Sequence, residues 1–140
     1  MDSIFLDANV LFSAAYRSDA GLRKLWRLAG VRIVTSAYAV EEARRNLSQP
    51  PHHRELDELL GCVEVVPTAA PTDHLLFSSV VELPNKDRPV LLAAIGEGAT
   101  HLLTGDFWHY MGPYCGKRIQ RVLILSPRDY LSLRTRIAGP

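Results

Sequence analysis

Four acidic residues stand where side chains could carry chemistry. Asp7 and Asp106 each follow a short apolar run that predicts a β-strand, while Glu42 and Asp87 lie in or at the start of segments that predict helices. Carboxylate oxygens are ligands that Mg²⁺ and Mn²⁺ prefer in proteins. If the four acids meet, they form an oxygen-lined site for a divalent cation. A site of this kind can hydrolyse a phosphodiester.

The size and composition of the chain predict one soluble globular domain over residues 1–140. Its 140 residues are enough to bury a core, and 47% hydrophobic against 22% charged residues falls outside the disordered, collagen-like and disulfide-rich classes. Sixteen Lys and Arg residues against fifteen Asp and Glu give a net charge of +1. This balance excludes a global positive field, so any contact with nucleic acid must come from a local patch.

The cysteines and the N-terminal segment predict a protein of the reducing cytoplasm. Cys62 and Cys115 lie far apart, in no spacing typical of a zinc site or a disulfide framework. The opening MDSIFLDANV has no basic start, and its apolar stretch is too short for a signal peptide or a membrane span. We therefore expect neither export nor membrane attachment.

Apolar runs and helix signals alternate along the chain. Strands are predicted at residues 4–6, 31–34, 63–66, 101–104 and 120–125, and helices at 10–16, 20–29, 37–47, 52–60, 73–81 and 90–95, with a last helix opened by Ser126-Pro127. Pro50 and Pro51 are predicted to end the helix at 37–47. Five strands separated by helical segments indicate an α/β fold, with a parallel five-stranded sheet sandwiched between helices.

This topology would bring distant residues to one place. Ligands of such sheets bind beyond the carboxyl ends of the strands. Asp7 follows the first predicted strand, Thr35 and Ser36 belong to the end of the second, and Asp106 follows the fourth. We therefore expect these residues to share one edge of the sheet.

Each acid also has a purely structural interpretation. Asp7 could cap the first helix, Asp87 could cap the helix at 90–95, and Asp106 could be a turn residue after a glycine. Glu42, beside Glu41, could belong to a solvated helix face. Their joint placement favours a metal site, because carboxylates packed together repel one another unless a cation is bound between them.

Four segments, in order, resemble the PIN domain family of nucleases: FLDANVLFSA, SAYAVEEARRNL, NKDRPVLLAAI and THLLTGDFWHY. The resemblance spans most of the chain and is closest to prokaryotic PIN proteins assigned as toxins of toxin–antitoxin systems. It implies that Asp7, Glu42, Asp87 and Asp106 are the catalytic and metal-binding residues, with Glu41 as the competitor of Glu42. It also implies that Asn9 and Thr104 support the ligands.

The activity that this resemblance implies is hydrolysis of RNA with Mg²⁺ or Mn²⁺, without a covalent enzyme intermediate. An antitoxin partner and a homodimer are implied as well. His109 either assists at the phosphate or packs on a helix surface. Basic residues near the acids are interpreted as contacts to the RNA backbone or as charge partners of carboxylates: Arg44, Arg45, Lys86 and Arg88.

Other protein classes fit the acids less well. A receiver-type signalling domain would pair acids near its first strand and place a lysine after its last, where Ser126-Pro127-Arg128 stands here. A phosphatase with an aspartyl nucleophile would have a second aspartate at the position of Asn9. A catalytically silent PIN-fold module that binds RNA or a protein partner is the remaining alternative, although such variants typically lose acids.

Overall fold

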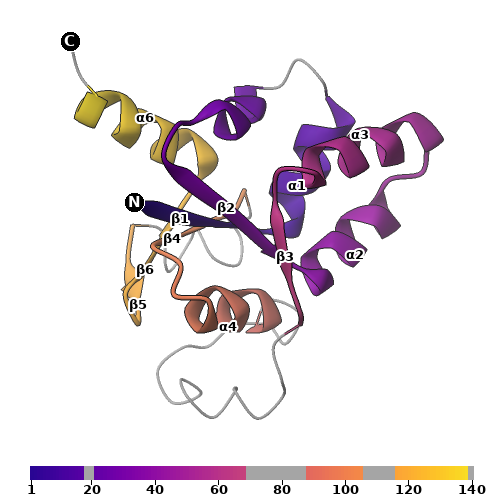
Figure 1. Ribbon diagram of the computed structural model, residues 1–140. Coiled ribbons are helices and arrows are strands. Elements are labelled where there is room, and N and C mark those ends of the chain that lie inside the picture. The colour runs from indigo at the N-terminus through magenta and orange to yellow at the C-terminus, as the bar shows by residue number, and fades with distance from the viewer. Residues whose placement is uncertain (18–20, 69–87, 106–115, 139–140) are drawn as a thin grey trace.

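The computed structural model describes residues 1–17, 21–68, 88–105 and 116–138, and over these residues a mixed sheet lies between helices (Figure 1). The strands are β1 Asp2–Leu6, β2 Val31–Ser36, β3 Glu64–Val66, β4 His101–Leu103, β5 Arg118–Ile119 and β6 Val122–Leu125. The helices are α1 Ala8–Tyr16, the 3₁₀ helix η1 Gly21–Arg27, α2 Ala37–Asn46, α3 Pro50–Leu60, α4 Arg88–Gly96 and α6 Pro127–Ala138.

The sheet confirms the predicted α/β class and adds one strand to it. Its order is β3-β2-β1-β4-β6-β5, and the five predicted strands are all present and mutually parallel. The expected count of five was wrong, because β5 pairs antiparallel with β6 at the edge. The turn between them, Gln120-Arg121, has positive φ at both residues, 46° and 77°. Two-residue hairpin turns with positive φ at both positions usually contain Asn-Gly, so the Gln-Arg sequence gave no recognisable signal of a hairpin.

The order of the strands creates a switch point between β1 and β4. The chain leaves β1 toward β2 and β3 on one side, whereas β4 is followed by β6 on the other. The connections that leave the two strands run to opposite sides at such a point, and ligands bind beside it at the carboxyl ends of the strands. Asp7 directly follows β1 and Thr104 directly follows β4, so both lie at this switch point.

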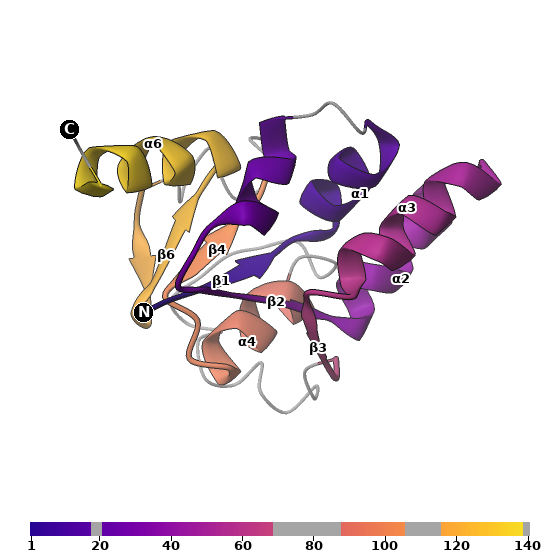
Figure 2. The ribbon, with the colours of Figure 1, turned by 45° about the horizontal axis from the view of Figure 1, so that its top comes forward.

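Helices cover both faces of the sheet. Figure 2 shows α4 on one face and α1, η1 and α6 on the other. A helix that joins parallel strands runs back along the sheet, so α4, which leads into β4, begins at the carboxyl edge. The helices α1, α2 and α6 begin there too, because each directly follows a parallel strand.

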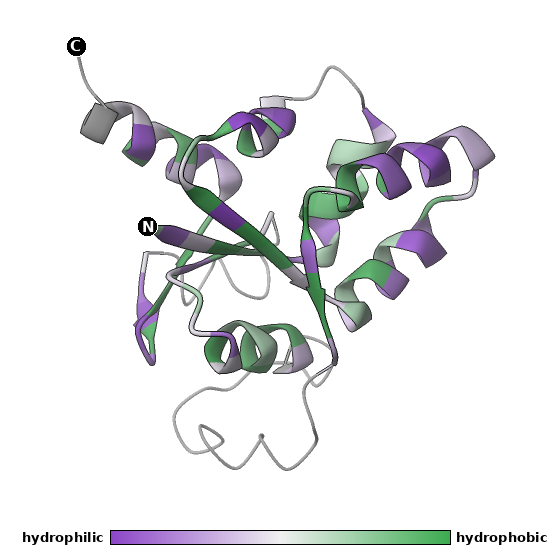
Figure 3. Cartoon of the chain, viewed as in Figure 1, coloured by the Kyte–Doolittle hydropathy of each residue, from purple (hydrophilic) through white to green (hydrophobic). Residues whose placement is uncertain are grey.

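The central strands form the core. Ile4, Phe5 and Leu6 of β1 and Leu102 and Leu103 of β4 are completely buried. A parallel strand covered on both faces is apolar at successive positions rather than alternating, and the hydrophobic colouring of the central strands and α4 in Figure 3 reflects this. The buried strands give the residues at their carboxyl ends a rigid base.

Two local predictions were wrong. The helix expected at 20–29 is a 3₁₀ helix over Gly21–Arg27, in which Leu25 is the buried residue. Pro50 and Pro51 do not end α2, which stops at Asn46; they occupy the first positions of α3, where a missing N–H costs nothing. The helix predicted at 73–81 lies outside the described residues. In the described part of the chain, no helix has the length and hydrophobicity to cross a bilayer.

Candidate functional site

Asp7 is a buried carboxylate at the carboxyl end of β1. Its backbone N–H donates to the carbonyl oxygen of Leu103 at 3.0 Å, so it extends the pairing of β1 with β4 before the chain turns into α1. Asp7 is the N-cap of α1, and its Oδ1 accepts from the N–H of Ala8 at 2.7 Å. The residue is 6% exposed. The helix start therefore fixes the carboxylate on one side.

Thr104 fixes the same carboxylate from the neighbouring strand. Its N–H donates to the carbonyl oxygen of Leu125 at the end of β6 at 3.1 Å. Its hydroxyl is buried, donates to Oδ2 of Asp7 at 2.8 Å and accepts from Nδ2 of Asn9 at 3.1 Å. Thr104 therefore ties together the ends of three parallel strands around the Asp7 carboxylate.

Asn9 completes this arrangement and holds the segment that leads to Asp106. Its Nδ2 lies 3.4 Å from Oδ2 of Asp7, and its Oδ1 accepts from the N–H of Gly105 at 2.9 Å. Gly105 directly precedes Asp106 in the sequence. The amide of Asn9 thus fastens the end of β4 to the first turn of α1.

The chemistry of these groups fits a hard cation. The groups that orient the Asp7 carboxylate include neutral donors from Ala8, Asn9 and Thr104. Oxygen is the donor type that Mg²⁺ and Mn²⁺ prefer. Within residues 1–17, 21–68, 88–105 and 116–138, no group of three His, Cys, Asp or Glu side chains is arranged to hold a metal. A complete ligand set would therefore have to include acids beyond those ranges.

Several predicted site residues lie in those other ranges. Lys86, Asp87, Asp106 and His109 are outside the described residues. Arg88 is the first residue of α4, and its side chain is outside the description. The described backbone includes one direct neighbour of each of these two acids: Gly105, which precedes Asp106, and Arg88, which follows Asp87.

The end of β2 positions Glu42. Ser36 caps α2, with its Oγ accepting from the N–H of Ala39 at 3.2 Å, and Thr35 donates to the carbonyl oxygen of Leu6 at 2.8 Å. These bonds tie the start of α2 to the end of β1. Glu42 is half-buried, on the helix side next to buried Ala39 and Ala43, whereas Glu41 is exposed.

The two arginines of α2 behave differently. Arg44 forms an ion pair with Asp57 of α3, which makes it a structural charge partner in this structure. Arg45 is exposed, and its side chain makes no hydrogen bond or ion pair with any of the described residues. The backbone of α2 near its end is further held by Asn46, which donates to the carbonyl oxygen of Glu42 at 3.0 Å.

A cavity that the sequence did not predict opens beside Asn9 and Gly105. It has a volume of about 640 Å³ and is lined in part by Asn9, Ser13, Gly105 and Arg128. Ser126-Pro127 signalled only the start of a helix. Because Ser126-Pro127 follows a parallel strand, the sequence could have been used to predict that the next residue, Arg128, lies at the same edge of the sheet.

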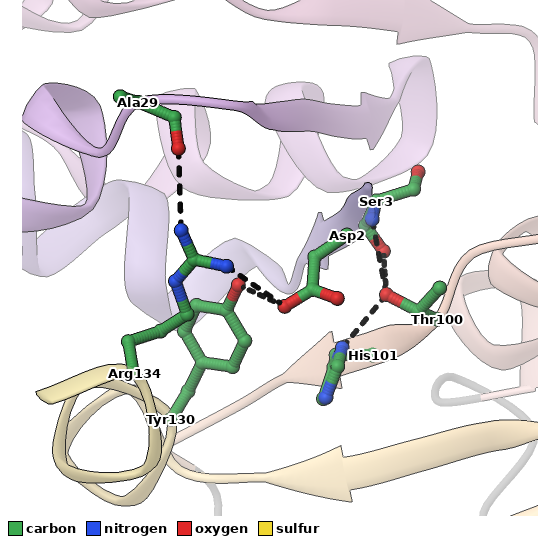
Figure 4. Close-up of polar contacts among 7 residues, drawn as sticks. All are labelled: Asp2, Ser3, Ala29, Thr100, His101, Tyr130 and Arg134. Carbon is green, nitrogen blue, oxygen red and sulfur yellow. Dashed lines mark hydrogen bonds and ion pairs between the residues drawn. The ribbon is translucent and has the colours of Figure 1, made fainter. Parts of the chain in front are cut away.

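A second polar cluster lies at the opposite, amino edge of the sheet (Figure 4). The hydroxyl of buried Tyr130 donates to Oδ2 of Asp2 at 2.7 Å, and Arg134 pairs with the same oxygen at 3.5 Å. Thr100 Oγ1 lies 2.7 Å from Nδ1 of His101, whose ring packs edge-on against Tyr130. This cluster fastens α6 to the start of β1 and β4.

Solved structures share this fold. A chain of VapBC2 from Rickettsia felis, crystallised with a DNA fragment from its promoter, aligns with a TM-score of 0.65 and 16% identity, over 89% of this chain and 98% of the other. VapC20 from Mycobacterium tuberculosis, described as a sarcin-ricin loop cleaving toxin, aligns with a TM-score of 0.54 and 17% identity, over 74% and 92%.

These similarities confirm the PIN-type fold that the sequence predicted. No protein-family model and no curated protein sequence matches the chain.

Proposed function

We propose that this chain, which has the fold of the PIN-domain toxins, is an endoribonuclease that hydrolyses RNA with Mg²⁺ or Mn²⁺. One observation carries the proposal: the buried Asp7 carboxylate, held by Thr104 and Asn9 at the switch point between β1 and β4. The ligand-binding crevice of an open α/β sheet lies at this point.

Asp7 and Asp106 are the proposed direct ligands. Asp7 ends β1, and Asp106 follows Gly105, whose N–H is bound by Asn9. A cation bound there would activate a water molecule and stabilise negative charge on the phosphate. Thr104 and Asn9 keep the Asp7 carboxylate in one orientation, which preorganises the site.

Glu42 and Asp87 complete the proposed set, as ligands, as partners of bound water or by orienting the nucleophile. The half-buried position of Glu42 beside Ala39 and Ala43 favours it over exposed Glu41. Asp87 directly precedes α4, which begins at the carboxyl edge.

We further propose that the chain acts as the toxin of a toxin–antitoxin pair and forms a homodimer. The similarity to VapBC2 supports an antitoxin partner, and the similarity to VapC20, a toxin that cleaves the sarcin-ricin loop, supports RNA as the substrate. The near-neutral net charge of +1 implies that RNA is bound by a local patch.

The direct test is metal-dependent cleavage of mixed RNA by the purified protein. Wild type is expected to cleave with Mn²⁺ or Mg²⁺ and to stop when chelator is added. Asp7→Asn and Asp106→Asn are expected to lose cleavage and remain folded. Asp57→Asn is the matched control, because Asp57 is an exposed acid on α3. Full activity in both site variants would refute the proposed centre.

Thermal unfolding gives a second readout that needs no substrate. A cation that binds only the folded protein stabilises it by about 2.7 kcal/mol at one hundred times its Kd. Mn²⁺ should raise the melting temperature of wild type and Asp57→Asn but not that of Asp7→Asn. No shift and no cleavage in wild type would favour the alternative, a catalytically silent module that binds RNA or a protein.

A further inference from the structure

A trough runs from the candidate site along α6. The cavity of about 640 Å³ beside Asn9 and Gly105 adjoins a larger one of about 840 Å³, and both are lined by Leu22, Arg128 and Ser132. Figure 2 shows η1 beside α6 on this face of the sheet. We call the two joined cavities the α6 trough. One of its ends is lined by Asn9, which contacts Asp7, and by Gly105, whose N–H is bound by Asn9.

Positive charge predominates among the described residues that line the α6 trough. They include Lys24, Arg128 and Arg134 but only one acid, Asp129. Arg134 is engaged by Asp2 and by the carbonyl oxygen of Ala29. Lys24 and Arg128 are exposed, and the side chain of neither makes a hydrogen bond or ion pair with another residue in the described part of the chain. Both are available to an anionic ligand.

Apolar side chains also line the trough. Leu22, Leu28 and Leu131 are partly buried and line its larger cavity. Cationic side chains without a partner, next to apolar side chains, suit a polymer that has a charged backbone and flat bases with weakly polar faces. Single-stranded nucleic acid has this character, and its binding grooves combine cations along the backbone with surfaces for the bases.

We propose that the α6 trough holds the RNA strand on one side of the scissile phosphate, with Arg128 and Lys24 contacting backbone phosphates. The inference rests on the proposed nuclease function. Arg128 lines both cavities and Lys24 only the larger one, so Arg128 contacts the phosphate nearer the site. RNA is favoured over a protein ligand because the trough reaches Asn9 and Gly105, the residues beside Asp7 and Asp106 at the candidate site.

Binding measurements test this assignment without cleavage. The probe is a fluorescein-labelled single-stranded RNA, with anisotropy recorded in chelator over a range of salt concentrations. Arg128→Gln and Lys24→Gln are each expected to weaken binding roughly 3- to 10-fold and to lower the slope of log K against log salt by about 0.7, the value for one lost phosphate contact on a single strand. Arg54→Gln is the matched control, since Arg54 is an exposed arginine on α3.

Kinetics with Mn²⁺ separate substrate positioning from chemistry. A contact made equally in the ground state and the transition state affects KM and leaves kcat unchanged. Arg128→Gln should therefore raise KM and keep kcat near the wild-type value. If wild type cleaves RNA but Arg128→Gln and Lys24→Gln match Arg54→Gln in KM and salt slope, the trough assignment is refuted.

These measurements distinguish failure of the proposed nuclease function from failure of the trough assignment. Loss of RNA binding in the two variants, with no cleavage by wild type, would support the trough and refute the nuclease proposal. Hydrogen exchange is an independent check, because bound RNA should protect amides of η1 and α6. RNA that protects neither helix, while an acidic peptide does, would overturn the assignment in favour of a protein ligand.

Discussion

The two ends of β1 each carry an aspartate, in contrasting surroundings. Asp2, at the amino end, accepts from the hydroxyl of Tyr130 and is paired with the cationic Arg134. Asp7, at the carboxyl end, is contacted by the neutral donors of Ala8, Asn9 and Thr104. The partners of Asp2 tie a helix to the sheet, whereas the donors to Asp7 come from the end of β4 and the start of α1, where open α/β sheets bind ligands. The first arrangement serves the fold, and the second suits a site.

The energetics of the amino edge support this contrast. The side chains of Arg134 and Asp2 are 30% and 29% exposed, so screening by water keeps their ion pair in the range of about 0–1 kcal/mol. The hydroxyl of Tyr130 matters more, because Tyr130 is completely buried and Asp2 is its acceptor. Burial and the hydrogen bond to Asp2 raise the pKa of Tyr130, which keeps the hydroxyl a donor.

The largest expected effect separates the two aspartates. Asp7→Asn should lower kcat/KM for RNA cleavage by about a thousandfold, roughly 4 kcal/mol, because the proposed cation loses its ligand. Asp2→Asn should leave kcat of the folded protein within about twofold but reduce the free energy of unfolding by about 1–3 kcal/mol, as the environment of Tyr130 is disturbed. Urea unfolding and cleavage assays on both variants measure this. Loss of kcat in Asp2→Asn would contradict the contrast.

Thr104 tests whether orientation of the Asp7 carboxylate matters. Thr104→Val keeps the shape of the side chain and removes the hydroxyl that bonds Asp7 and Asn9. We expect kcat/KM to fall about 10- to 100-fold, as for other residues that orient a metal ligand. Thr104→Ser retains the hydroxyl and should recover most of the activity. Equal activity of the valine and serine variants would show that this hydrogen bond does not contribute.

The pH dependence of stability reports on the amino edge. Burial, together with the charges of Arg118 and Arg134, lowers the pKa of His101 below 6.5, while Asp2 acts in the opposite direction. Below about pH 6.5 the unfolded chain therefore binds more protons at this residue than the folded one, and the free energy of unfolding falls as pH falls. Above that value the contribution is constant.

His101→Gln should flatten this part of the profile. Urea unfolding of wild type and variant between about pH 5 and pH 8 measures it. An unchanged slope in the variant would assign the pH dependence to other groups. Cleavage by the folded variant should be retained, because His101 lies at the amino edge.

The sequence predicted one of these edges better than the other. Asp7 and Thr104 follow apolar runs, and parallel topology brings the ends of such runs together, so their convergence could be predicted. Asp2 gave no comparable signal, because its partners Tyr130 and Arg134 lie on a helix whose packing angle no local pattern encodes. The α6 trough was missed for the same reason, since its walls combine residues of α1, η1 and α6.

The smallest expected effect concerns the turn at the amino end of β6. Arg121 has a φ of 77°, a conformation that costs a non-glycine residue about 1–2 kcal/mol. Arg121→Gly should raise the free energy of unfolding by roughly 0.5 kcal/mol, because relief of this strain exceeds the added freedom of the unfolded chain. Arg121→Ala is the control, since it removes the same side chain and keeps the strain. Differential scanning calorimetry measures the difference in stability between the two variants. A drop in RNA cleavage by the glycine variant alone would link the amino edge of the sheet to activity.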